Sequence, residues 1–378
     1  MIRKAFLVVF LISISLVCTT VINAQVTPRT DSTTLIKIEA YLQSLIDTGG
    51  VPGITVAITR GQDIVYANAF GVGNVIMEEK LTPRKIFHVA SISKTFTATA
   101  VMQLVEKGLV GLEEPLVKYL PYFRLADDRC KQITIHQILN HTSGMPDVED
   151  YEWEKAVADA GAAERYTRSL TGKKMVSAPG TEFHYSNMAY DVMADLIAKV
   201  SGITFEQYVK ENILIPLGMN ESSFYYPEIK GTLRTSPHTG IPPTVRQYYP
   251  YNRMHAPSST LNSNVLELSH WAIANMNHGV YKGKQILTPK THAMMMTPGF
   301  IARKDQQISI GLSWFLYKYQ GQTIAEHSGG DDGYRSQLML MPDAGISFVL
   351  LSNTDDINMH SVMKKVRDLI IGVTSASN

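Results

Sequence analysis

The sequence predicts an α/β fold, in which an antiparallel β-sheet is flanked by helices and a mostly helical lobe is inserted into the chain. Strand-like patterns occur towards both ends of the sequence, whereas between about 115 and 257 Pro and Gly separate short helical patterns. A sheet assembled from both chain ends would leave that middle segment as a second lobe. We therefore expect one lobe from 34–114 with 258–378, a helical lobe from 115–257, and a cleft between them.

The elements follow from hydrophobic spacing. Leu and Ile recur at helical spacing over 35–46, and alternation at 54–58 and 64–66 around Gly61 predicts a β-hairpin. A short buried stretch at 87–89 precedes a helix expected over 91–108. Further helices are expected at 188–200, 205–213, 265–276, 291–296 and 358–371, and further strands at 313–317, 323–326, 337–341 and 347–351.

The composition indicates a chain that buries a large core. Of its 378 residues 45% are hydrophobic, and 35 Lys and Arg balance 34 Asp and Glu to a net charge of +1. Such a charge provides no basic field for a polyanion, so we expect no nucleic-acid partner. A small-molecule or peptide substrate is expected instead, and the oligomeric state stays open.

The first 24 residues have the pattern of a secretory signal. Arg3 and Lys4 precede an apolar run over 5–17, and the small residue Ala24 lies where cleavage would occur. The run is shorter than the ~20 apolar residues that span a membrane. We therefore expect an exported protein, periplasmic or extracellular, with a hydrolase domain over 25–378 and no stable membrane insertion after cleavage.

The two cysteines bear on the anchor and on stability. Cys18 follows Val17, where a lipoprotein signal has a small residue, so a lipid anchor is the less favoured alternative. After cleavage Cys130 would be the only cysteine, so no internal disulfide is expected.

Several common chemistries have no matching motif. The sequence contains no G-x-S-x-G elbow, no H-E-x-x-H and no P-loop. His136 and His141 are five residues apart and would not share a helix face, which makes them a poor metal pair. We expect no metal and no organic cofactor.

The first chemical motif is Ser91-Ile92-Ser93-Lys94 at the start of a helical pattern. Residues three apart on a helix lie on one face, so the Lys94 amine can reach the Ser91 hydroxyl and help remove its proton. The helix N-terminus adds backbone N–H groups that stabilise developing negative charge. The same spacing at Ser361 and Lys364 is expected to be a surface coincidence.

The second motif is Tyr185-Ser186-Asn187, immediately before a helical pattern. A phenol near an ammonium group is expected to have a lowered pKa and to shuttle a proton, and the Asn187 amide would orient Lys94 or accept a substrate N–H. Tyr66-Ala67-Asn68 has the same spelling, but its position inside a strand predicts a core tyrosine.

The third motif is His327-Ser328-Gly329-Gly330, expected at the end of a strand. Glycines there allow a substrate to lie along the strand edge, and the Gly330 N–H would complete an oxyanion hole with that of Ser91. The similar His238-Thr239-Gly240 lies among prolines without a flanking strand.

Together, S-I-S-K-T-F, Y-S-N after P-G-T-E-F-H, and H-S-G-G resemble the serine β-lactamase and D,D-peptidase superfamily. The likeness is greatest to the branch of class C β-lactamases, similar D,D-carboxypeptidases and related esterases and amidases. Supporting stretches are I-L-N-H-T-S-G-M-P at 138–146, I-P-L-G-M at 215–219 and V-L-L-S-N ending at Asn353, so the resemblance covers roughly 35–372.

The resemblance implies a β-lactamase/transpeptidase-like fold and a role for each motif residue. Ser91 would be the acylated nucleophile, Lys94 the base or proton relay, Tyr185 the activating phenol, and Asn187 the orienting amide. His327, Gly329 and Gly330 would bind and orient the substrate. The implied activity is hydrolysis of an amide or ester by a D,D-peptidase, β-lactamase or esterase. A non-catalytic penicillin-binding or sensing module on the same fold is the alternative.

Position 327 departs from the lactamase pattern, where a lysine opens the third motif. A neutral imidazole holds a carboxylate less firmly than an ammonium group, and Asp331 and Asp332 follow closely. Efficient β-lactamase action is therefore not expected, and activity should change near pH ~6.5 as the ring titrates. His141, in H-T-S-G, is expected to form a helix stop and turn that support the cleft wall.

Overall fold

A computed structural model describes residues 28–373. The expected signal segment, 1–24, lies outside the described residues. Between 28 and 373, no helix combines the length and the apolar character that crossing a membrane requires.

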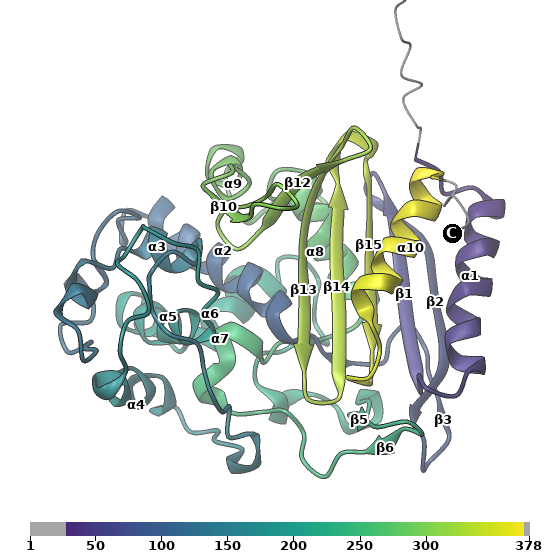
Figure 1. The fold of residues 1–378 in the computed structure, drawn as a ribbon, viewed down its shortest axis with the longest axis horizontal. Coiled ribbons are helices and arrows are strands. Elements are labelled where there is room, and N and C mark those ends of the chain that lie inside the picture. The colour runs from purple at the N-terminus through teal and green to yellow at the C-terminus, as the bar shows by residue number, and fades with distance from the viewer. Residues whose placement is uncertain (1–27, 374–378) are drawn as a thin grey trace, which may run out of the picture.

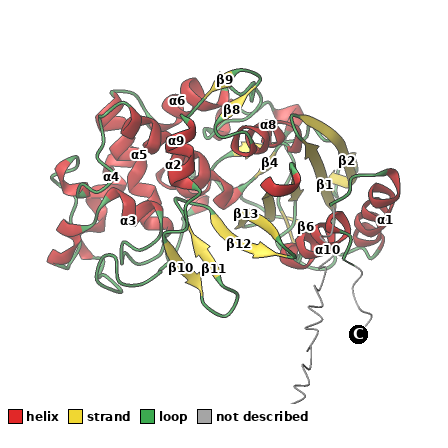
Figure 2. Cartoon of the chain, turned by 90° about the horizontal axis from the view of Figure 1, so that it is seen from above, coloured by secondary structure: helices red, strands yellow, loops and turns green. Residues whose placement is uncertain are grey.

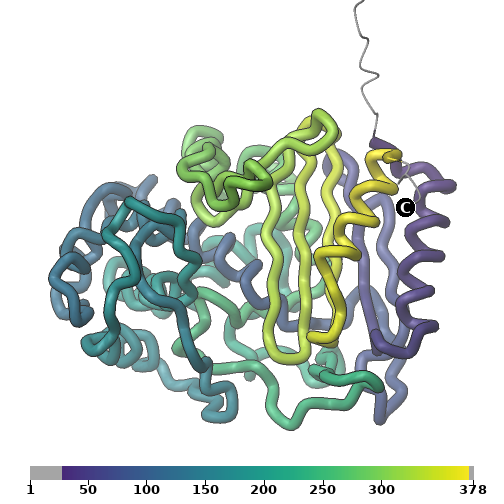
Figure 3. The backbone as a smooth tube through the Cα atoms, in the orientation of Figure 1, coloured from purple at the N-terminus to yellow at the C-terminus, as the bar shows by residue number. Residues whose placement is uncertain are grey.

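The fold is built on a nine-stranded antiparallel sheet (Figure 1), in the order β10-β11-β12-β13-β14-β15-β1-β2-β3. Its strands are β1 (Gly53–Arg60), β2 (Asp63–Asn74), β3 (Glu79–Lys80), β10 (Phe300–Arg303), β11 (Ile308–Ile310), β12 (Phe315–Tyr319), β13 (Gln322–Asp331), β14 (Tyr334–Met341) and β15 (Ile346–Ser352). The two chain ends meet where β1 pairs with β15, from Ile54 opposite Ser352 to Arg60 opposite Ile346. Figure 3 shows this pairing as purple tube beside yellow.

Helices cover both faces of the sheet. On one face α1 (Ser32–Asp47) and α10 (Met359–Ile371) share a core with Ile54, Val56 and Ile58 of β1. On the other, α8 (Val265–Met276) and α2 (Ser93–Glu106) pack in the larger core, which contains Ala57 of the same strand. Alternate residues of β1 therefore serve the two cores, as the pleat of a strand requires.

Shorter helices gather beside the sheet, towards the left of Figure 2. They are α3 (Ile135–Leu139), α4 (Ala162–Ser169), α5 (Asn187–Ser201), α6 (Phe205–Val209), α7 (Ala256–Ser259) and α9 (Pro289–Met295). The remaining strands form three two-stranded pairs: β4 (Phe87–His88) with β7 (Asn262–Ser263), β5 (His238–Thr239) with β6 (Thr244–Val245), and β8 (Val280–Tyr281) with β9 (Lys284–Gln285).

The predicted α/β class, with helices flanking an antiparallel sheet, is confirmed, and three local expectations change. The hairpin of β10 and β11 was not anticipated, because β11 is only three residues long. The helix expected from 91 begins as a 3-10 turn over Ala90–Ile92. Strand β13 continues through both glycines to Asp331 instead of ending near 326.

Candidate active site

Ser91, the expected nucleophile of the first motif, lies in the 3-10 turn that leads into α2. Ser91 is half-buried, and the Lys94 Nζ, on a completely buried side chain, lies 2.9 Å from its Oγ. Nζ also donates to the carbonyl oxygen of Ser258 at 2.8 Å. The expected pairing of Ser91 and Lys94 is therefore present, and a backbone carbonyl from α7 fixes the amine.

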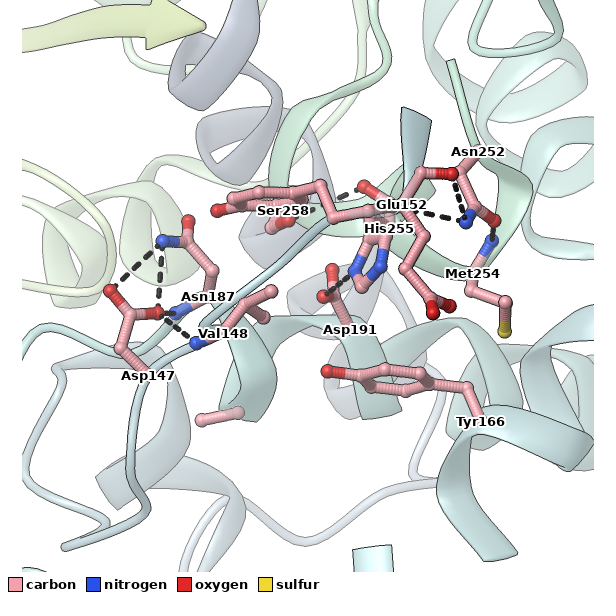
Figure 4. Close-up of polar contacts among 12 residues, drawn as sticks. Asp147, Val148, Glu152, Tyr166, Asn187, Asp191, Asn252, Met254, His255 and Ser258 are labelled. Carbon is pink, nitrogen blue, oxygen red and sulfur yellow. Dashed lines mark hydrogen bonds and ion pairs between the residues drawn. The ribbon is translucent and has the colours of Figure 1, made fainter. Parts of the chain in front are cut away.

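Burial alters the proton affinity of the amine. It lowers the pKa of Lys94 from 10.5 to about 7, while the carboxylates of Asp191, Asp147 and Asp331 act in the opposite direction. Asp191 is itself buried and lies 2.7 Å from the Nδ1 of His255, as Figure 4 shows. A substantial neutral fraction of Lys94 at pH 7 is able to accept the proton of Ser91.

The backbone around the nucleophile is held in an uncommon conformation. Ala90 has a φ of +47°, in the left-handed region that costs a non-glycine residue roughly 1–2 kcal/mol. Its neighbour Val89 accepts a hydrogen bond from the Ser336 hydroxyl at 2.7 Å. The Ser93 hydroxyl is buried and accepts the backbone N–H of Leu261 at 3.0 Å, so Ser93 has a structural role.

Gly329 explains why β13 runs so close to this turn. A Cβ at position 329 would lie 2.3 Å from the carbonyl oxygen of Val89 and 3.0 Å from the backbone nitrogen of Ser91. Only glycine fits there without displacing the nucleophile segment. Gly330 is less constrained, since a Cβ would only meet Arg335 at 3.4 Å.

Tyr185 lies immediately before Ser186, the N-cap of α5, and its ring is 4.9 Å from the Lys94 Nζ. The expectation of a lowered pKa was wrong. Burial raises the pKa of Tyr185 above 10, and the neighbouring Ser91 hydroxyl offsets this only in part. The phenol therefore stays protonated at neutral pH, which suits a proton donor and relay working beside a neutral Lys94.

Asn187 begins α5, but its side chain is not hydrogen-bonded to Lys94. Its Nδ2 donates to Oδ1 of Asp147 at 3.0 Å, and its backbone N–H donates to the same oxygen at 2.7 Å (Figure 4). The Asn187 Oδ1 is buried without a hydrogen-bond partner among residues 28–373. Lys94 is thus held by Ser91 and Ser258, and of the two roles expected for the Asn187 amide only that of accepting a substrate N–H stays a prediction.

His327 lies inside β13 with 1% of its surface exposed. Its Nδ1 is 2.7 Å from the Ser328 carbonyl oxygen, so the proton is on Nδ1 and Nε2 is an acceptor. Burial, with the charge of Lys94, lowers the pKa of His327 to about 3. The ring is neutral near pH 6.5, and the expectation that it titrates there was wrong.

The two acidic residues after the third motif have partners of their own. Asp331 lies 3.0 Å from the Nε2 of His88, and Asp332 pairs with Arg246 at 2.7 Å. Their carboxylates therefore oppose a substrate carboxylate less than the sequence suggested.

A hollow of about 320 Å³ opens beside the free part of β13. Strand β12 pairs with β13 only as far as Glu326, so the following residues border this hollow. Its wall includes Ser328, Gly329, Gly330, Arg303, Arg335, Asn358 and His360. An extended substrate backbone can add to this strand edge, and three of the wall residues are cations or can become cations.

The look-alike motifs are not part of this site. Ser361 and Lys364 are exposed on α10. The Tyr66 hydroxyl donates to Glu39 of α1, and both ring nitrogens of His238 bond to backbone groups. In the part of the chain that the structure describes, no group of three His, Cys, Asp or Glu is arranged to hold a metal ion.

The sequence did not identify three residues that shape the site. Ser258 acts through its carbonyl oxygen, which no side-chain pattern reveals. Asp147 is three residues beyond the supporting H-T-S-G stretch, so proximity to that motif is the one available signal. Asp191 is four residues after Asn187 on the same face of α5, a spacing that periodicity alone attributes to the core.

The pKa of Lys94 predicts how the rate of acylation depends on pH. Because the unprotonated amine is the base, kcat/KM for a neutral p-nitrophenyl ester should rise with pH through about 7 and level off above it. A profile from pH 5 to 9 checks this. His327→Gln should keep the same inflection, since the wild-type ring is neutral throughout. Loss of the inflection in that variant would assign it to His327 instead.

Comparisons with known proteins show which family the chain resembles. The family model described as Beta-lactamase matches residues 38–371. "Protein flp" of Staphylococcus aureus (strain N315) is 26% identical over 341 residues, 88% of this chain, and the chain spans only 65% of that relative. "Penicillin-binding protein 4*" of Bacillus subtilis (strain 168) is 24% identical, covering 88% of this chain and 76% of the relative.

A solved structure extends the comparison to three dimensions. The octameric penicillin-binding protein homologue from Pyrococcus abyssi superposes with a TM-score of 0.77 at 26% identity, over 89% of this chain and 77% of that one. The resemblance to the serine β-lactamase and D,D-peptidase superfamily is confirmed. The extent of the family match shows that the chain belongs to the beta-lactamase family.

Proposed function

We propose that the chain is an exported serine hydrolase that forms an acyl-enzyme on Ser91 and hydrolyses an amide or ester bond. The observation that carries this proposal is the 2.9 Å contact between Ser91 Oγ and a buried Lys94 whose pKa is about 7. The proposal of export rests on the signal-like pattern of the first 24 residues. We also propose that the substrate binds in a cleft between two lobes, one formed by 34–114 with 258–378 and the other by 115–257.

The proposed reaction has two steps. The Ser91 oxygen attacks the substrate carbonyl carbon while its proton passes to the neutral Lys94, and the backbone N–H groups of Ser91 and Gly330 stabilise the oxyanion. The C–N or C–O bond then breaks, and the leaving group takes a proton through Tyr185. Water attacks the ester on Ser91 in the second step, which releases the acid and restores the serine.

Cell-wall peptide trimming is the substrate class that we favour, with β-lactams and simple esters or amides as the competing classes. A neutral His327 supplies no charge for a substrate carboxylate. The guanidinium groups of Arg303 and Arg335, in the wall of the hollow beside β13, are available to pair with such a carboxylate. The names of two relatives, penicillin-binding proteins, support a peptide-like acyl donor.

Intact mass spectrometry separates these possibilities. We expect a stoichiometric adduct with a fluorophosphonate, and release of a D-amino acid from at least one member of a panel of D-amino-acid peptides. A penicillin adduct that persists, with no turnover of any peptide, ester or amide, would instead indicate a binding or sensing module. Absence of every adduct from the folded protein would contradict the proposal.

A further inference from the structure

The H-T-S-G turn contributes a residue that the proposed reaction has not used. His141 follows α3, is completely buried, and has a φ of +58°. The left-handed region is costly for most side chains, although His and Asn adopt it more readily than most. Ending α3 does not by itself require a buried histidine in this conformation at the site.

His141 contacts three successive residues of the second-motif segment. Its carbonyl oxygen accepts the backbone N–H of His184 at 2.9 Å, and its Nδ1 accepts the N–H of Ser186 at 3.1 Å. Between these two bonds, its ring stacks on that of Tyr185, with centroids 4.1 Å apart and planes 22° from parallel. The histidine thus fixes the backbone on both sides of Tyr185 and one face of its ring.

The protonation state of His141 follows from these contacts. Because Nδ1 accepts a hydrogen bond, the ring proton is on Nε2, which is buried without a partner among residues 28–373. Burial, with Lys94 and His327 nearby, lowers the pKa of His141 well below 6.5. The rings of Tyr190 and Phe183 also pack on it, with centroids 4.9 Å and 6.0 Å away. Neither carries a negative charge that would raise the pKa of His141. The ring therefore stays neutral and keeps its acceptor over the working pH range.

We propose that His141 is a positioning residue that holds the Tyr185 hydroxyl in line with Ser91 for proton transfer. This inference rests on the proposed acyl-enzyme function. According to it, the H-T-S-G turn increases kcat in addition to supporting the fold. His141 does not touch the reacting atoms and acts only through Tyr185. Small displacements of a proton-transfer group are costly, so loss of the stack should reduce turnover by about 10-fold or more.

His141→Asn is the informative variant. Asparagine tolerates a positive φ and offers an Oδ1 near the place of Nδ1, so the Ser186 N–H keeps an acceptor while the stacked ring is lost. We expect an unchanged KM, an unchanged melting temperature within a few degrees, and kcat lower by about 10-fold on the best ester substrate. His136→Asn is the matched control, because that histidine is partly exposed and contacts Glu113 at 2.7 Å, away from Tyr185.

A double-mutant cycle decides between positioning and support of the fold. When Tyr185→Phe has removed the hydroxyl, His141→Asn should cost less than about 2-fold in kcat, since nothing remains to be aligned. An equal loss in both backgrounds, or no loss in either, would overturn the proposal. If His141→Asn does not fold, His141→Gly provides a second cycle: glycine adopts the positive φ without strain, the stacked ring is again lost, and the reduction in kcat should again depend on the Tyr185 hydroxyl. Failure of the acyl-enzyme proposal gives a different result, namely full activity in Ser91→Ala.

Discussion

Ser91→Ala is expected to lower turnover of the best substrate by at least ~10³-fold, the largest effect that we expect from any single substitution in this chain. The Ser91 side chain is half-buried, and its Oγ lies 2.9 Å from the Nζ of the buried Lys94. Removing this oxygen leaves Lys94 intact and creates no buried vacancy, so the fold should persist. Initial rates with a p-nitrophenyl ester, and intact mass after fluorophosphonate treatment, measure the loss of turnover and of the adduct.

Ser361→Ala is the matched control for this variant. Ser361 has the same spacing to a lysine, Lys364, but both side chains are exposed on α10. Its replacement should change neither the rate nor the adduct. Peptide mapping of the wild-type adduct to Ser93 or Ser361, or wild-type activity in Ser91→Ala, would show that the nucleophile is misassigned.

Tyr185→Phe should lower acylation or deacylation by at least ~10²-fold while the protein folds normally. The substitution keeps the ring that stacks on His141 and removes only the hydroxyl near Ser91. Because the pKa of this phenol is raised, the wild-type group is a neutral proton donor. Its loss should slow each step in which a proton is transferred to the leaving group. Stopped-flow measurement of the burst and of the steady-state rate separates acylation from deacylation.

The Tyr185→Phe result also discriminates between proton pathways. If the variant hydrolyses its best substrate at the wild-type rate, Lys94 transfers protons without the tyrosine. Tyr66→Phe supplies the control, since that hydroxyl contacts Glu39 on the sheet face covered by α1 and is remote from the site.

The sequence was a good guide to which residues meet and a poor guide to their ionisation. The spacing of Ser91 and Lys94 predicted their contact, since helix geometry alone determines it. It could not predict that Lys94 would lose its charge near pH 7 or that His327 would stay neutral, because both follow from burial beneath residues distant in the chain. The same holds for Tyr185: its proximity to an amine predicted a lowered pKa, whereas desolvation raises the pKa.

In the fold as well, some features were predictable from the sequence and others were not. Helices with a clear apolar stripe, such as α8 at Val265–Met276, were predicted to the residue, whereas the short hairpin of β10 and β11 was missed. Asn187 was correctly placed at a helix start, but its partner Asp147 lies 40 residues earlier in a loop without regular structure. Local patterns determine elements, and long-range packing determines which side chain faces which.

The pairing of β1 with β15 also determines when the sheet can be completed. Ile54 is synthesised long before its partner Ser352, so β1 has only β2 beside it until β15 has been made. The nucleophile and the strand that carries His327 are separated in the same way. Contacts between such distant segments form slowly, and apolar strand edges stay open to aggregation meanwhile. Loss of β15 by truncation or proteolysis would therefore separate β1 from β14 and expose the buried side chains of both strands.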